Sequence, residues 1–224
     1  MPTNKPQPRA KPLTPPRVKP STAARILDSA EQRFAQRGYG ATSLADIADD
    51  VSIRAPSLYK HFESKRALYI AVLDRLLAPY VELVGRLLVM PNDASEAGAN
   101  LLAVVQHYMR TPNLARLVQH ATLSDDEELE LLVERWYGPL FARATELTTN
   151  APYLGASKTR ALSLVVSFHA MMSGYVTLGP LHARLTGTDP YGDEAVNEQL
   201  TLMAQVAMQL WRVEHATPEG KPHA

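Results

Sequence analysis

The chain has 224 residues, enough for one larger or two smaller domains with a buried core. It contains no cysteine, which excludes disulfides, thiolate metal sites and cysteine catalysis, and which suits the reducing cytoplasm. The net charge is zero, but residues 1–66 carry 12 Lys and Arg against 6 Asp and Glu, whereas residues 67–224 carry 11 against 17. Unless this segregation is chance, it indicates a polyanionic partner for the N-terminal third.

Residues 1–20 contain seven prolines and five Lys or Arg, with no acidic residue. Proline at this density favours an extended, disordered basic arm. No apolar stretch follows the basic residues, so the segment does not resemble a secretory signal peptide, and we expect a cytoplasmic protein. At the other end, we expect residues 216–224 to form a flexible tail.

Two short helices are expected directly after the arm. The first begins near Ser21 and continues to Gly38, which supplies a left-handed stop. The second begins at Thr42 or Ser43, residues that cap helix N-termini, and ends near Asp50.

A third short helix is expected after the tight connection Val51–Ser52–Ile53. Pro56 lies in its first turn, where proline is tolerated, and the helix ends near His61 and Phe62. Helix, three-residue turn and short helix are the plan of a helix-turn-helix DNA reader, here over about residues 43–62.

The remaining chain has helical periodicity and no alternating strand, so the sequence predicts an all-α fold. Pro79 and Pro139 are expected to kink or break the helices that contain them. The expected helices cover about 62–90, 95–110, 112–122, a segment that starts with the capping residues 124–127, 157–185 and 193–214.

One apolar run, Ala161–Leu181, has the length of a membrane span. Its three serines, His169 and Pro180 would be costly against lipid. We therefore expect no membrane association, and a helix buried between a core and a subunit interface.

The stretch from Gly40 to Lys65 resembles the DNA-binding signature of the tetracycline-repressor (TetR) family. The family's turn usually reads Ala-Gly-Val, whereas this chain has Val51-Ser52-Ile53. If the glycine conformation is kept, Ser52 takes a left-handed backbone angle at a cost of ~1 kcal/mol; otherwise the turn differs slightly in geometry. The matching landmarks, which keep the family's spacing without a gap, are Phe34, Gly38, Thr42, Ile47, Ala48, Leu58, Tyr59, His61, Phe62, Lys65 and Leu68.

The resemblance implies a DNA-binding domain at residues 21–75 and a helical ligand-binding and dimerisation domain at residues 76–215. It implies a transcriptional regulator, expected to be a repressor, that binds a pseudo-palindromic operator in double-stranded DNA as a homodimer. A small, largely apolar effector would release it.

The resemblance also implies which side chains contact DNA. Hydroxyls and amides at a helix N-terminus can bind phosphate, and an arginine at the start of a recognition helix can bind guanine. Tyr59 matches a backbone contact of the family, although a tyrosine there could also be a core residue. The expected DNA contacts are Thr42, Ser43, Arg54, Ala55, Ser57, Leu58, Tyr59, Lys60, His61 and Lys65.

Two further sets of residues follow from the resemblance. Aromatic, histidine and methionine side chains suit an apolar effector, although at helical spacing they can equally be plain core. The candidate effector contacts are His107, Tyr108, His120, Trp136, Tyr137, Phe141, His169, Met172 and Tyr175. The candidate dimer interface, on the last two helices, comprises Phe168, Met171, Leu200, Met203, Ala207 and Trp211.

Alternatives remain open at this point. A DNA-binding protein without an inducer would share the N-terminal motif. An enzyme is disfavoured, because no nucleophile elbow, phosphate-binding glycine loop or His-Glu-x-x-His motif is present. The histidines show no metal-ligand spacing, and we expect neither a metal nor a cofactor. The basic arm could add contacts to DNA or serve only as a solubilising tail.

Overall fold

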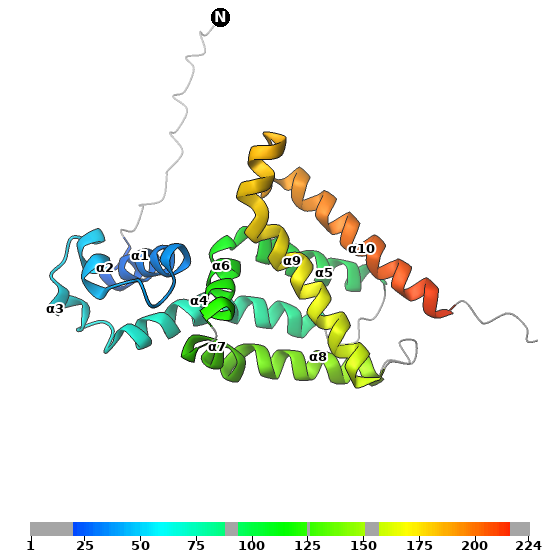
Figure 1. Ribbon diagram of the computed structural model, residues 1–224, viewed down its shortest axis with the longest axis horizontal. Helices are drawn as coiled ribbons and strands as arrows, with labels where there is room; N and C mark the ends of the chain where they lie inside the picture. Colours follow the sequence, from blue (N-terminus) through cyan, green and yellow to red (C-terminus); the bar gives the residue numbers. More distant parts are fainter. Residues whose placement is uncertain (1–19, 88–93, 125, 151–156, 216–224) are drawn as a thin grey trace, which may run out of the picture.

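The computed structural model describes residues 20–87, 94–124, 126–150 and 157–215, and within these ranges it contains helices and no strand (Figure 1). The all-α prediction is confirmed. The predicted tail and all of the predicted arm except Pro20 lie outside the described residues. The elements are α1 (Thr22–Arg37), α2 (Leu44–Asp50), α3 (Ala55–Leu58), α4 (Lys65–Leu87), α5 (Ala94–Arg110), α6 (Pro112–Ser124), α7 (Glu127–Leu132), the π-helical turn η1 (Val133–Tyr137), α8 (Gly138–Asn150), α9 (Lys158–Thr186) and α10 (Asp193–His215).

The caps of the first two helices lie where the sequence places them. The Ser21 hydroxyl accepts from the amide of Ala24 at 3.2 Å, and the Ser43 hydroxyl accepts from the amide of Asp46 at 3.1 Å. Gly38 ends α1 with a φ of 77°, and its amide donates to the Phe34 carbonyl. A Cβ at Gly38 would lie 3.3 Å from Nδ1 of His120, so glycine also permits close contact with α6.

The turn between α2 and α3 keeps the left-handed conformation despite the missing glycine. Ser52 has a φ of 55°, the one positive φ at a non-glycine residue in the described part of the chain. Its amide donates to the Asp49 carbonyl at 3.0 Å, and the amide of Ile53 donates to Ala48 at 3.0 Å. These hydrogen bonds hold Ser52 in a backbone region that a side chain disfavours.

The region around Pro139 differs from the expected single helix. Ser124 is the last residue of α6, and α7 is capped by Asp126, whose carboxylate accepts from the amide of Glu128. The predicted cap at Ser124 is therefore wrong by two residues. Before Pro139 the chain forms the π-helical turn η1, in which the amide of Gly138 donates to the Val133 carbonyl. Proline has no amide hydrogen to donate, and its ring crowds the carbonyl four residues earlier. The wider π-helical turn accommodates both the missing donor and the ring.

The helices share one core that extends from α1 to α10. α1 packs against α4 and α6, and α8 packs against α9 (Figure 1). α4 continues through Pro79 without ending, and it runs from the helix-turn-helix into the larger domain, so the two predicted domains share a helix. Arg75 on α4 is bonded to both Asp28 and Glu31 on α1.

α9 contains the apolar run, and it is buried on one side only. Met172 and Val176 lie in the core, whereas Leu178, Leu181 and Leu185 are exposed. Among the described helices, none combines the length and the apolarity needed to cross a membrane.

His169 lies inside an aromatic cluster of the larger domain. Its ring meets those of Tyr108, Tyr137 and Phe141 edge to face, with centroids 5.2–5.8 Å apart. Its Nδ1 is 3.5 Å from the hydroxyl of Tyr80, and no carboxylate compensates for its burial. Burial lowers the pKa of His169 from 6.5 to about 4, so the imidazole is neutral at pH 7.

Replacing Ser52 by glycine should stabilise the protein. Glycine adopts a φ of 55° without the penalty that a side chain incurs, so the free energy of unfolding should rise by about 0.5–1 kcal/mol. Urea denaturation measures the change. Ser52→Val, with a β-branched side chain, should lower the same quantity. Equal stability of the glycine variant and the wild type would show that the turn is not strained.

His169 should make stability depend on pH. Its pKa is lower in the folded chain than in the unfolded chain, so the unfolded chain binds the proton first as pH falls. The contribution is fully present above pH 6.5, is lost as pH falls from 6.5 to about 4, and amounts to about 3 kcal/mol. His169→Gln should lack this component. Parallel pH profiles of unfolding for the variant and the wild type would contradict the assignment.

Candidate nucleic-acid interface and internal pocket

The helix-turn-helix is held together by a small apolar core. Ile47, Ala48 and Leu58 are fully or almost fully buried and belong to the same cluster as Phe34 of α1. The guanidinium of Arg25 donates to the Val51 carbonyl at 2.6 Å and so fastens α1 to the end of α2. α3 is thereby fixed by its buried face, which leaves its other side toward solvent.

α3 is shorter than the sequence predicts. Its α-helical part ends at Leu58, and the chain continues to Phe62 as turns, in which the amides of His61 and Phe62 both donate to the Leu58 carbonyl. Arg54 is the N-cap residue, with extended backbone angles, and Pro56 follows in the first turn as predicted. The recognition element is one helical turn plus the turns that follow it.

Most of the predicted DNA contacts lie on the exposed side of this element. Tyr59 is 55% exposed, so the alternative that it is a core residue is wrong. Ala55 and Ser57 are half-buried beside it. The exposed positions among the predicted contacts are Ser43, Arg54, Tyr59, Lys60 and His61.

Two predicted contacts face inward instead. Leu58 has no exposed surface, because it is the side chain that anchors α3 to the core. Thr42 is 2% exposed, and its hydroxyl donates to the Gly38 carbonyl at 2.8 Å. Neither side chain can reach DNA in this conformation, and we correct the predicted set accordingly.

Lys65 has a structural partner. Its Nζ donates to the Gly40 carbonyl at 3.3 Å and lies 4.3 Å from the centre of the Tyr39 ring. Partial burial lowers its pKa. Lys65 thus ties the start of α4 to the loop before α2, beside the predicted phosphate contact Ser43.

Two of the three carboxylates of α2, Asp46 and Asp50, are paired with arginines of α1. Arg33 donates to both oxygens of Asp50, at 2.5 and 2.6 Å, and lies 3.7 Å from Asp46. The hydrogen bonds from Arg33 and Ser29 hold the pKa of Asp50 well below its usual range. Because these acids are occupied, they subtract little from the positive charge of Arg54 and Lys60 on α3.

A pocket of about 310 Å³ lies between α6, α7, η1, α8 and α9. Three of the predicted effector contacts line it, namely Tyr137, Phe141 and His169. The sequence reasoning missed the other lining residues, because aliphatic side chains and Thr122 carry no signal that separates a pocket wall from core. These missed residues are Val118, Thr122, Leu129, Leu132, Val133 and Gly138.

The other candidate effector contacts lie elsewhere. Tyr108 and Met172 are buried in the core, where Tyr108 contacts the ring of His169. His120 packs against Gly38 at the contact between α6 and α1. Of the rest, His107 and Trp136 do not line the pocket, and Tyr175 lines a different space.

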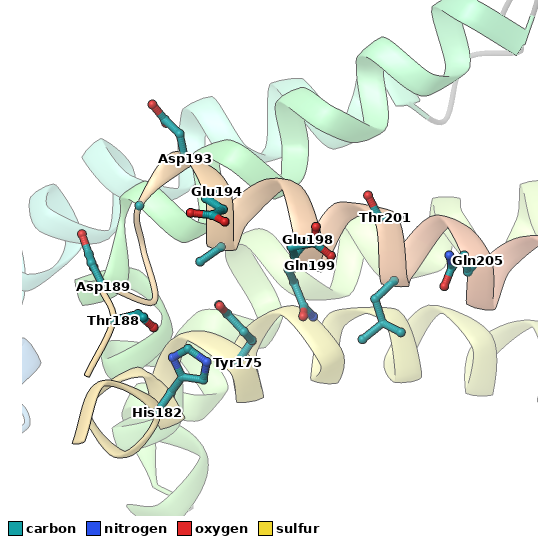
Figure 2. Close-up of a pocket in the computed structure, with 13 residues that line it drawn as sticks. Tyr175, His182, Thr188, Asp189, Asp193, Glu194, Glu198, Gln199, Thr201 and Gln205 are labelled. Carbon is teal, nitrogen blue, oxygen red and sulfur yellow. The ribbon is translucent and has the colours of Figure 1, made fainter. Parts of the chain in front are cut away.

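That second space, of about 720 Å³, separates α9 from α10, with Tyr175 and His182 on one side and Glu198 and Gln199 on the other (Figure 2). The two helices diverge from their common end (Figure 1). Within the described residues, no group of three or more histidines and carboxylates is placed to hold a metal ion.

Four of the six predicted dimer residues pack at least partly against the chain's own core. Met203 is 1% exposed, and Phe168, Met171 and Leu200 pack against the core cluster. The side chains of Ala207 and Trp211 lie outside the described residues. Met203 is therefore corrected, and the other predicted interface residues stay a prediction. Other apolar side chains of these helices are more exposed. They are Leu162, Val166, Leu178, Leu181, Leu185 and Leu202.

Comparison with known proteins agrees with this geometry in the N-terminal part. Residues 26–72 match the family described as "Bacterial regulatory proteins, tetR family". The transcriptional repressor ComR of Escherichia coli K12 is 49% identical over 51 residues, 23% of this chain and 24% of ComR. IcaR of Staphylococcus aureus Newman, a negative transcriptional regulator of a biofilm operon, is 48% identical over 44 residues, 20% of this chain and 24% of IcaR. The matches thus span about a quarter of these relatives.

Solved structures resemble the whole fold. AmtR of Mycobacterium smegmatis superposes with a TM-score of 0.59 and 21% identity over 88% of this chain and 89% of its own. FadR of Bacillus halodurans, a fatty acid degradation regulator, superposes with a TM-score of 0.59 and a sequence identity of 16%. The superposition covers 93% of this chain and 100% of the FadR chain. Identity this low shows the fold alone. Residues 26–72 thus match the tetR family of bacterial regulatory proteins, and the helical arrangement beyond them has the fold of these solved structures.

Proposed function

We propose that the protein is a transcriptional repressor that binds operator DNA as a homodimer and is released by a small, largely apolar effector. One observation carries the proposal: within eight residues, α3 with its N-cap and its following turn exposes Arg54, Tyr59, Lys60 and His61 to solvent. Cations, a phenol and an imidazole on one recognition element suit phosphates and base edges. The names of ComR and IcaR, a repressor and a negative regulator, support the sign of regulation.

On DNA, α3 would enter the major groove. Arg54 at its N-terminus can form two hydrogen bonds with guanine, while Tyr59 and Lys60 can contact the backbone. The amides at the start of α2, next to the exposed Ser43, suit a phosphate. A recognition element this short reads few bases, so specific binding requires two copies on a pseudo-palindromic site.

The second copy would cover α9 and α10. Leu178, Leu181 and Leu185 form an exposed apolar face near the end of α9, and Leu202 is exposed on α10. The space between the diverging helices is open in one subunit (Figure 2) and has room for the partner's side chains. An exposed apolar face of this kind indicates an interface.

α6 would carry the response from the effector to the DNA. Val118 and Thr122 on α6 line the pocket of about 310 Å³. On the same helix, the amide of Asn113 donates to Glu31 of α1 at 2.9 Å, and His120 packs against Gly38 at the end of α1. An effector that displaces α6 would therefore reorient α1, and with it the helix-turn-helix.

The function is tested by footprinting and affinity measurement on the DNA that flanks the protein's own gene. About four phosphate contacts per subunit imply a slope of log K against log salt near −7 for the dimer. A slope shallower than about −3, or specific binding as a monomer, would contradict dimeric operator binding. Compounds that lower the affinity identify effectors; a protein whose affinity no compound changes would be a constitutive binder.

Arg54 and Lys60 provide a matched pair on α3. Arg54→Ala should cost about 1–3 kcal/mol on the preferred site and relax the preference at one base pair in each half-site. Lys60→Ala should weaken binding to all sequences alike and reduce the salt slope, because it removes only a phosphate contact. Binding to a panel of single-base operator variants separates the two. A uniform loss for both variants would mean that Arg54 does not read a base.

Leu178→Glu should dissociate the dimer. A carboxylate in an apolar interface remains without a partner, which costs several kcal/mol, whereas on the surface of a monomer it is harmless. Sedimentation velocity should then show monomers with unchanged helicity. Leu123→Glu is the matched control, since Leu123 is an equally apolar, 76% exposed side chain on α6, outside the proposed interface helices. A Leu178→Glu protein that stays a tight dimer would place the interface elsewhere.

A further inference from the structure

The pocket beside α6, called here the apolar pocket, has walls on five consecutive elements of the larger domain. Val118 and Thr122 come from α6, Leu132 from α7, Tyr137 from η1, Phe141 from α8 and His169 from α9. We propose that this pocket takes an uncharged ligand about the size of two fused six-membered rings. The inference rests on the proposed function, since it names the chemical class of the effector.

Among the described residues, the walls offer no charged group that could pair with an ion. None of the residues that line the pocket is Asp, Glu, Lys or Arg, and nearly all the surface they present is carbon. The imidazole of His169 is neutral, since burial lowers its pKa to about 4. Behind it, burial raises the pKa of Tyr80, Tyr108 and Tyr137, so these phenols are uncharged too. An ion that binds against these walls gives up part of its hydration without gaining a charged partner, which favours an uncharged ligand.

Glu128 is the one buried acidic residue in the described part of the chain, and it lies on α7 near this region. It is not among the residues that line the pocket. A cationic ligand would need this carboxylate to turn toward the pocket, whereas an uncharged ligand needs no such change.

The volume sets the size of the ligand. Benzene fills an apolar protein cavity of about 150 Å³. The apolar pocket, at about 310 Å³, has twice that volume. This corresponds to a two-ring molecule, at the small end of the range for ligand pockets.

The aromatic side chains favour a flat ligand. The rings of Tyr137 and Phe141 are tilted by 47° with centroids 5.8 Å apart, and both meet the His169 ring at steep angles. A flat aromatic ring gains offset or edge-to-face contacts with such a group beyond the burial of its area.

The walls also provide a blocking position. Thr122 lines the pocket from the exposed side of α6, and its hydroxyl is bonded to the Val118 carbonyl at 2.8 Å. Thr122→Phe adds a ring there without changing the buried core. Gln119, exposed on the same helix and absent from the pocket walls, provides the control Gln119→Phe.

The experiment compares three probes with the same ring system and different charge at pH 7: 2-naphthol, 2-naphthoate and 2-naphthylmethylammonium. Calorimetry and thermal shift on the full chain should show that 2-naphthol binds at least about a hundredfold more tightly than either ion. Phenol and 1-hydroxypyrene, one ring and four rings, should bind more weakly than 2-naphthol. Thr122→Phe should weaken 2-naphthol about tenfold or more, while Gln119→Phe leaves it within about twofold.

Operator affinity of each variant, measured without any probe, keeps the two proposals apart. Equal or tighter binding of an ion would overturn the assignment of charge, and equal loss in both phenylalanine variants would put the site elsewhere. If no naphthalene probe binds while operator DNA is bound normally, the effector class is wrong and the DNA-binding function stands. If operator DNA is not bound, the proposed function fails whatever the probes do.

Discussion

The contact of α1 with α4 and α6 is the constraint on which the rest of the structure depends. The carboxylate of Glu31 on α1 accepts from Arg75 of α4 and from Asn113 of α6. It is a part-buried group whose two donors come from different helices, so a rotation of α1 relative to either one breaks a charge-assisted hydrogen bond. Since α2 packs on α1 and α3 packs on α2, their orientation follows that of the larger domain.

The distribution of charge has a second consequence for the helix-turn-helix. The acids of α2 would oppose a polyanion if they were free, but Arg33 binds Asp50 and lies near Asp46. The pairs are largely exposed and stabilise the fold little by themselves. Their effect is on the surface potential. Because Asp46 and Asp50 are paired with α1, they offset less of the positive charge that Arg54 and Lys60 present to a polyanion. The excess of positive charge in the sequence itself lies mainly in residues 1–20, which carry five cations and no acid, whereas residues 21–66 carry seven cations and six acids.

Sequence reasoning succeeded where local chemistry decides the structure. The caps at Ser21 and Ser43 depend on hydrogen bonds within a few residues, and both are confirmed. At Ser52 the sequence left two turn geometries open, and the structure has the left-handed one. It failed where the rotation of a helix about its axis decides which side chains face the core and which face DNA or a partner. Leu58 was expected to contact DNA, but α3 is too short for its periodicity to define an inner face. Met203 was expected at an interface, because an apolar stripe on α10 suits the chain's own core and a partner equally well.

The apolar pocket could not be predicted from its lining residues alone, because its shape depends on the path of the backbone before Pro139. Pro139 cannot donate to the carbonyl four residues before it, and the chain responds with the π-helical turn η1. Gly138 is required there, because a Cβ would lie 2.6 Å from the Val133 carbonyl. The extra residue in the turn rotates Tyr137 relative to a regular α-helix and sets it against His169 and Phe141. The Gly-Pro pair is therefore a better sequence marker of this pocket than the aromatic residues, which occur equally in ordinary cores.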